Sequence, residues 1–474
     1  MSGPIMTHGS IGGRRAASGA VAVSLLWACY VLVFPFHRVW VLPWLGYKLQ
    51  PPELVLVALV STAVAIGVRD RMPWRFTPTD AAAAGWVGAN LLGLIWSSEP
   101  RNYVGIIEAL GAASLVGLYA AVRVTATPAR LDRFPSWVGY SAACAAGMGI
   151  AGSVAAMWGW PNRLATDALT PIPYLGMAAR AQAFTAGPQM LASILLMAIP
   201  LFVASRMTRG WRRRDVAMGI VLVLGLGATL SKTALCLAPA LIVMWASAGR
   251  PTPGPRVRWA RPRAWMAATV WLITAGAFTL GSHVMLVREA EVPNMVSAEL
   301  VAGRPLASFR WRHEAWVAMP TTYVFNKQAS LVAIAQSWPM GVGPAGQEAF
   351  TRGLQLEGRF PASTSLITPH STYLKPVAEL GFAGAVALLL ILGTGILTIR
   401  RLLAGSTLPR WEAAAYAGIG AAFLIEAIST DLLNCRHYWL LLAVMAARLD
   451  AQSHGAGVPG SAYNRAATAA ARLG

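Results

Sequence analysis

Residues 373–399 read YLKPVAELGFAGAVALLLILGTGILTI, and this stretch decides the class of fold. Its only charged residues are Lys375 and Glu379, and it exceeds the roughly 20 apolar residues that cross a bilayer as a helix. Similar runs recur along all 474 residues, of which 56% are hydrophobic and 12% charged. Soluble domains have about 25% charged residues. This composition excludes a soluble globular enzyme and a disordered chain.

The apolar runs predict an all-α, polytopic membrane protein with about twelve transmembrane helices. Residues 1–286 hold nine of these helices, 287–372 form one large loop, 373–450 hold three more, and 451–474 form a tail. The first run is too long for a cleavable signal peptide and is followed by many others. The expected spans are 18–36, 52–68, 80–97, 103–122, 135–157, 187–205, 216–230, 232–248, 265–286, 373–399, 412–430 and 433–448.

Positive charge sets the expected orientation of these spans. Arginines gather in alternate connections, for example 206–214 and 256–263, while the connections between them carry few. Because cytoplasmic loops are enriched in Lys and Arg, both termini are expected in the cytoplasm. The net charge of +20 is spread through these short loops. We therefore expect contact with membrane lipids and no nucleic-acid partner.

The loop 287–372 is expected on the outer side of the membrane. Long loops translocate regardless of charge, so its arginines fit this topology. Apolar residues at i, i+3 and i+4 predict helices over Ser308–Met319 and Lys327–Trp338. The segment Pro339–Pro344 (PMGVGP) predicts a turn. Loops of this length are uncommon unless they are functional.

His370 is the leading candidate for catalysis. It lies where the long loop re-enters the membrane, in Pro369–His370–Ser371–Thr372. A neutral imidazole is a good general base near neutral pH, and a helix start disfavours the imidazolium. The alternative is a purely structural helix entry capped by Ser371 or Thr372.

A second group of candidates is basic and lies on the same side. It comprises Arg180, Lys232, Arg310 and Arg312. The forked guanidinium group of arginine forms hydrogen bonds to two phosphate oxygens at once. Several cations that converge could therefore hold a diphosphate. Each residue alone could equally be an interfacial anchor or a solvated charge.

Other chemistry finds little support in the sequence. The carboxylates Glu108, Glu379, Glu426 and Asp431 are sparse and poorly clustered, and could be ion-pathway or structural groups. The four cysteines have no metal or disulfide spacing. No phosphate-binding loop, dinucleotide fingerprint or nucleophile elbow occurs. We therefore expect no cofactor and no metal site.

One pattern around His370 resembles a known family. The ligases of the O-antigen ligase and polymerase superfamily carry His, then Asn, Ser or Gln, nine residues, Gly, two residues, and Gly, Thr or Tyr. Here His370–Ser371, Gly381 and Gly384 fit that pattern without exception. The location directly after the largest outer loop agrees with the family as well.

Further motifs extend the resemblance over residues 175–450. Family members often have an Arg followed by a Gly-Thr-Phe and Pro-Asn stretch before a helix. This chain is loosely similar there, with Arg180, Phe184, Gly187 and Pro188, and with Gln189 in place of the usual Asn. The Ser-Arg opening of a later span is Ser231–Lys232 here. The loop also holds the family's Arg-x3-Trp element, Arg312 to Trp316, and its Pro-x-Gly-Val-Gly-Pro element, Pro339–Pro344.

The resemblance implies a GT-C-like membrane glycosyltransferase that takes a glycan from undecaprenyl diphosphate at the periplasmic face of the bacterial inner membrane. A ligase would transfer the glycan to a terminal sugar of the lipid A core, without a metal and with inversion. The resemblance makes His370 the base and Arg180, Lys232 and Arg312 the diphosphate clamp, with Arg310 and Tyr373 as secondary residues. Alternatives are a polymerase or protein-glycosylating ligase of the same superfamily, or a transporter of lipid-linked sugar.

Overall fold

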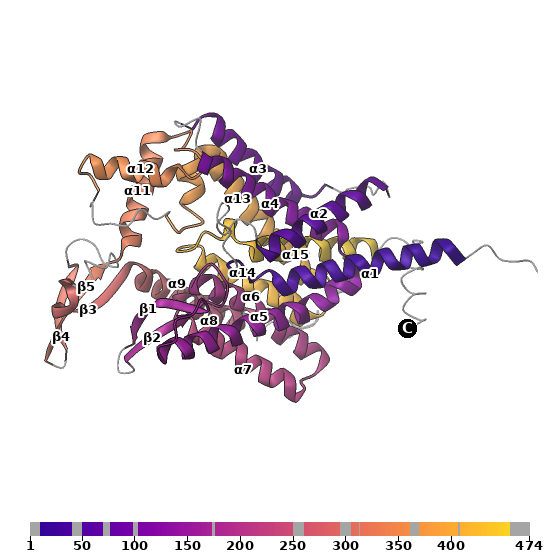
Figure 1. Cartoon of the computed structure of the whole chain (residues 1–474), viewed down its shortest axis with the longest axis horizontal. Helices are drawn as coiled ribbons and strands as arrows, with labels where there is room; N and C mark the ends of the chain where they lie inside the picture. The colour runs from indigo at the N-terminus through magenta and orange to yellow at the C-terminus, as the bar shows by residue number, and fades with distance from the viewer. Residues whose placement is uncertain are drawn as a thin grey trace, which may run out of the picture.

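The computed structural model describes residues 10–39, 50–69, 76–97, 103–172, 176–249, 260–293, 305–311, 313–360, 369–405 and 408–455. These residues form mostly helices, which pack side by side as a bundle, and five short strands lie toward one end of it (Figure 1). The mostly helical architecture confirms the coarse prediction. The strands correct the prediction of a purely helical fold.

Twelve helices within the described ranges coincide with the twelve apolar runs. They are α1 (Ser10–Val33), α2 (Pro51–Arg69), α3 (Pro78–Ile95), α4 (Tyr103–Thr125), α5 (Pro128–Met157), α6 (Pro188–Arg209), α7 (Arg213–Ala228), α8 (Leu237–Ala248), α9 (Ala260–His283), α13 (Lys375–Ala404), α14 (Arg410–Glu426) and α15 (Arg436–Gly455). A short 3₁₀ helix, η1 (Lys232–Cys236), separates α7 from α8, and η4 (Leu432–Asn434) precedes α15.

Six of these helices are long and apolar enough to cross a membrane alone: α2, α4, α5, α6, α9 and α13. Several others are shorter, such as α7 and α8, or are bounded by charged residues. The structure therefore supports a membrane-embedded protein. The count of twelve spans and the orientation stay predictions.

Helix α6 forms the centre of the bundle (Figure 1). Its residues from Leu191 to Ala198 are almost completely buried, whichever direction they face. A helix that is apolar all round is expected in the interior, because no face gains from solvent or lipid exposure. Helices α5, α7 and α14 pack around it.

Ionic side chains join the helices at the end of the bundle opposite the start of α13. Arg448 of α15 contacts Asp132 at 2.7 Å and Glu412 at 2.5 Å. Arg123 of α4 contacts Asp450 at 2.8 Å and also pairs with Asp80. These groups are costly to bury unless they are paired, so each pair specifies which helices become neighbours.

The strands occur outside the apolar runs. A hairpin of β1 (Ala165–Ile172) and β2 (Gly176–Ala181) packs against α5. A three-stranded antiparallel sheet has the order β3-β5-β4, with β3 (Val284–Arg288), β4 (Ala307–Trp311) and β5 (Glu314–Pro320); the 3₁₀ helix η3 (Glu289–Glu291) follows β3.

The helix predicted over Ser308–Met319 is therefore wrong. That segment forms β4 and β5, joined by a turn at His313, whose φ is +68°. The apolar residues that matched helical spacing include Phe309, Trp316 and Val317, and aromatic and β-branched residues fit strands well. Pairing of β5 with strands on both sides satisfies its backbone groups and overrides the local pattern.

The second helix predicted in the loop is confirmed, and a further helix follows it. Helix α11 (Thr322–Ser337) covers most of the expected Lys327–Trp338 segment, and Pro339–Pro344 forms a turn. Helix α12 (Gly346–Leu356) lays its apolar face on α11, where Phe325, Ala329, Leu354 and Phe360 form a small core. Helix α11 in turn packs against α13 and α9, so it connects the loop to the bundle.

Candidate functional site

The loop that carries His370 is held by hydrogen bonds to the end of α14 and the segment that follows. The backbone N–H of Thr372 donates to the carbonyls of Ala427 and Thr430, at 2.9 and 3.0 Å. Its hydroxyl donates to the Thr430 carbonyl at 2.6 Å and accepts from the Leu432 N–H at 2.9 Å. Thr372 is buried, whereas His370 stays partly exposed with a φ of +44°. These bonds fix a backbone conformation that non-glycine residues rarely adopt.

Gln189 supports the same loop from the start of α6. Its amide nitrogen donates to the Ser429 carbonyl at 3.2 Å and to the hydroxyl of Thr430. Gln189, which stands where the resembled superfamily usually has Asn, therefore holds the segment whose Thr430 carbonyl accepts hydrogen bonds from Thr372.

Helix α11 places an aromatic ring and a cation beside His370. The ring of Tyr323 meets the His370 ring edge-on, with 5.5 Å between centroids. Lys327 lies one turn further along α11, and its Nζ donates to Nε2 of His283 at 2.5 Å. The other ring nitrogen of His283, Nδ1, donates to the Thr279 carbonyl at 2.6 Å. His283 thus bonds as a neutral imidazole that positions Lys327.

Two more cations come from the opposite side of the site. Arg180 lies in β2, and its Nε donates to the carbonyl of Thr229 at 3.0 Å. The side chain is partly buried and close enough to Tyr323 and Lys232 for their charges to interact. Lys232 opens η1, and its side chain extends over Gly281 of α9. Arg180, Lys232 and Lys327 thus come from three separate parts of the chain, and we call them the cation cluster.

The cation cluster has no carboxylate partner among the residues that the structure describes. No Asp or Glu oxygen there lies within 4 Å of a nitrogen of these three side chains. Burial lowers the pKa of Lys327 to about 8 and that of Arg180 below its ordinary value. Like charges brought together without an anion are unfavourable, so the cluster is suited to a bound anion.

His370 is positioned to be a neutral base. Burial lowers its pKa, and the charges of Lys375 and Lys327 lower it further, while Asp431 acts in the opposite direction. The imidazole is therefore uncharged near neutral pH, which is the state that accepts a proton. Burial also raises the pKa of Tyr323, so its hydroxyl remains a donor.

A cluster of carboxylates surrounds Lys375, at the first turn of α13. Its Nζ lies 2.6 Å from Glu108 of α4 and 2.9 Å from Asp431. The amide of Asn434 donates to both carboxylates, at 2.6 and 2.8 Å. The prediction that the carboxylates are poorly clustered is wrong here, because tertiary packing joins residues more than 300 positions apart. The carboxylates of Glu108 and Asp431 balance the positive charge of Lys375, so this lysine does not belong to the cation cluster.

The glycines of the His370 pattern have a structural role. Helix α13 is interrupted at Gly381, whose φ is +58°. The segment Pro339–Gly343 lies against this break, with hydrogen bonds from Val342 N–H to Ala378 O at 3.0 Å and from Phe382 N–H to Pro339 O at 2.8 Å. A Cβ at Gly381 would lie 2.5 Å from the Met340 carbonyl carbon. The turn at Pro339–Gly343 and the helix break at Gly381 are distant in sequence but pack together, and we call this contact the joint.

Arg310 and Tyr373, two further predicted site residues, lie outside the cluster. Arg310 is exposed on β4, an edge strand that lies away from the helical bundle in Figure 1. Arg312 lies outside the described residues. The hydroxyl of Tyr373 donates to the Leu424 carbonyl at 2.6 Å, so it anchors the loop to α14. The structure thus links His370 to Arg180 through Tyr323, and Arg180 to Lys232.

Sequence reasoning missed Tyr323, Lys327 and His283 as site residues. Their spacing in sequence shows no motif, and only the fold of the loop over α9 brings them to His370. A buried polar group below the site was missed as well: the Ser193 hydroxyl bonds Glu426 at 3.0 Å and His437 at 2.7 Å. Within the described ranges, no group of three or more His, Cys, Asp or Glu side chains is arranged to hold a metal ion.

Comparison with known proteins gives no relative for this chain, since no family model matches it and no curated protein is similar to it. The assignment therefore depends on the site. A neutral imidazole near cations that have no carboxylate partner among the described residues can take a proton from a hydroxyl while an anionic leaving group is stabilised.

Proposed function

We propose that the protein is an O-antigen ligase, which transfers a glycan from undecaprenyl diphosphate to a terminal sugar of the lipid A core. The observation that carries this proposal is the unpaired cation cluster of Arg180, Lys232 and Lys327 beside His370. A diphosphate leaving group carries negative charge that such a cluster stabilises. The apolar helices agree with a lipid-linked donor, and the sequence pattern at His370 favours a ligase.

The reaction would be a single displacement. His370 removes the proton of the acceptor hydroxyl as its oxygen attacks the anomeric carbon. The bond between that carbon and the diphosphate breaks, and its electron pair passes to the phosphate oxygen. Arg180, Lys232 and Lys327 stabilise the charge that develops there. One displacement inverts the anomeric configuration.

Tyr323 and Asp431 would assist His370 in different ways. The Tyr323 ring limits the rotation of the imidazole, and its hydroxyl faces the side from which Arg180 reaches the site. Asp431 is close enough to stabilise the imidazolium that forms during transfer. Lys375 and Asn434 hold its carboxylate in place.

The test is transfer by the purified protein from an undecaprenyl diphosphate-linked glycan to lipid A core, with EDTA and without nucleotide. We expect transfer by the unaltered protein. His370→Ala should lower the rate by roughly 10²–10⁴-fold, the usual contribution of a general base. Lys327→Gln and Arg180→Gln should each lower it by about 10-fold or more. Arg352→Gln is the matched control, because Arg352 is exposed on α12 and pairs with Glu348.

Different failures have different meanings. A ladder of longer lipid-linked glycans from donor alone would indicate a polymerase. Donor binding without any transfer would favour a transporter of lipid-linked sugar. Transfer by His370→Ala at the unaltered rate would remove His370 as the base.

A further inference from the structure

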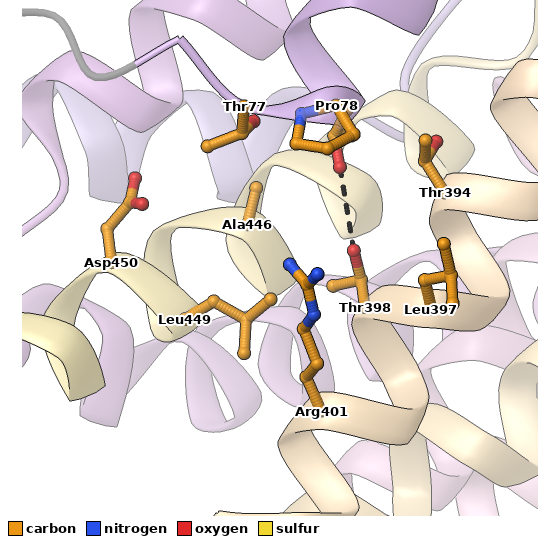
Figure 2. A pocket seen from close by; sticks show the side chains of 10 residues that line it. Thr77, Pro78, Thr394, Leu397, Thr398, Arg401, Ala446, Leu449 and Asp450 are labelled. Carbon is orange, nitrogen blue, oxygen red and sulfur yellow. Dashed lines mark hydrogen bonds between the residues drawn. The ribbon is translucent and has the colours of Figure 1, made fainter.

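A polar pocket lies at the far end of the bundle from His370. It has a volume of about 260 Å³ and is formed by the start of α3, the last turns of α13 and the end of α15 (Figure 2). Helix α13 begins beside His370, and at about 1.5 Å per residue Thr398 lies roughly 30–40 Å along it. The pocket is therefore separate from the proposed transfer site.

The two charged residues that line the pocket, Arg401 and Asp450, lie on opposite sides of it (Figure 2). Arg401 extends from α13 into the space between Leu449 and Thr398, and Asp450 lies on the opposite side (Figure 2). No carboxylate oxygen among the described residues lies within 4 Å of the Arg401 guanidinium. Asp450 pairs with Arg123 at 2.8 Å, and its side chain remains 32% exposed. The Arg401 side of the pocket is thus positive, and the Asp450 side is partly negative.

Hydroxyl groups and apolar side chains complete the lining. The hydroxyls of Thr79 and Thr398 are both buried and lie 3.5 Å apart, and one of them has its hydrogen available for a ligand. Leu397, Ala446 and Leu449 form an apolar wall. Hydroxyl and guanidinium donors suit a phosphate group, and the apolar wall suits the hydrocarbon attached to it.

We propose that this pocket binds the headgroup of a membrane phospholipid that carries both a phosphodiester and a primary amine. Arg401 and the threonine hydroxyl bind the phosphate, and Asp450 accepts hydrogen bonds from the ammonium group. The pocket opens between helix ends at the edge of the apolar region, where lipid headgroups lie, and basic pockets between helices bind such headgroups. On the predicted orientation, this is the cytoplasmic leaflet. The proposal is independent of the proposed function.

The experiment is native mass spectrometry of the full-length protein, titrated with phosphatidylethanolamine or phosphatidylglycerol. We expect the unaltered protein to prefer phosphatidylethanolamine. Arg401→Gln should weaken both lipids by about 5–10-fold, the low end for a charge-assisted hydrogen bond because the site is open. Asp450→Asn should weaken phosphatidylethanolamine alone. Arg401→Lys should restore most of the binding.

Arg400→Gln is the control variant. It removes the same charge from the adjacent position of α13, but Arg400 lines a different, apolar cavity between α13, α14 and α15. Equal binding of the two lipids by the unaltered protein, or equal losses from Arg400→Gln and Arg401→Gln, would overturn the proposal. Equally strong binding of soluble phosphoethanolamine would overturn the assignment to a lipid. Should Asp450→Asn fail to fold, the lipid preference of the unaltered protein decides the amine site.

Discussion

The joint between α13 and the loop predicts the effect of Gly381→Ala. Gly381 has a φ of +58° and a ψ of −137°, a conformation that costs an L-residue about 1–3 kcal/mol. Its new Cβ would also crowd the backbone of Pro339 and Met340, and overpacking costs about 1–3 kcal/mol. The less flexible unfolded chain offsets roughly 0.4–1 kcal/mol of this. We therefore expect a net destabilisation of roughly 1–5 kcal/mol.

The assay is the thermal unfolding midpoint of the purified protein, with Gly393→Ala as the matched control. Gly393 lies on the same helix, and nothing lies within 4 Å of the position of its Cβ. Alanine is the better helix former by about 0.5–1 kcal/mol, so this variant should be neutral or stabilised. Gly381→Ala should unfold several degrees lower and lose transfer activity with it. Equal midpoints for the two variants would refute the joint as described.

Three further changes test the site and the packing around it. Thr372→Val removes the hydroxyl that bonds Thr430 and Leu432, and should lower the transfer rate, whereas Thr372→Ser should keep most of it; equal rates would contradict the role of the hydroxyl. Lys327 has a pKa of about 8, so its positive charge is present below that pH and lost above it. Donor binding should therefore weaken as the pH rises above 8, and the transfer rate should fall with it. Lys327→Arg should abolish this fall. If the rate of Lys327→Arg falls above pH 8 as that of the unaltered protein does, Lys327 is not the cause of the fall. Arg448→Met leaves Glu412, whose side chain is 12% exposed, without its ion-pair partner but with its hydrogen bond from Tyr416, and should destabilise the protein by about 3 kcal/mol in thermal unfolding, the low end for a broken buried pair; an unchanged midpoint would show that this pair is dispensable.

The helices could be predicted from the sequence because their signal is local. Runs such as 187–205 and 373–399 contain almost no charge, so they form helices whatever surrounds them. The same reasoning failed over Ser308–Met319, where apolar residues at helical spacing form two strands. There the outcome depends on hydrogen bonds to β3, which the local pattern does not contain.

His370, Arg180 and Lys232 were found in the sequence because each lies at an abrupt boundary between apolar and polar segments. Lys327, Tyr323 and His283 have no such marker. They reach the site only because α11 packs over α9 and α13. The ion pairs of Lys375 with Glu108 and Asp431 also needed the fold, since their favourable energy exists only at a few ångströms.

The sequence by itself therefore determined that the chain forms apolar helices, where most of them lie, and which histidine lies shortly before α13. Hydrophobicity and helix length are properties of neighbouring residues, and they need no knowledge of distant contacts. Only the tertiary structure decided that Lys327 and Tyr323 come close to His370, and that Gly381 lies against Pro339. Those features depend on which surfaces pack together, because charge interactions and steric exclusion act at short range between residues far apart in the chain.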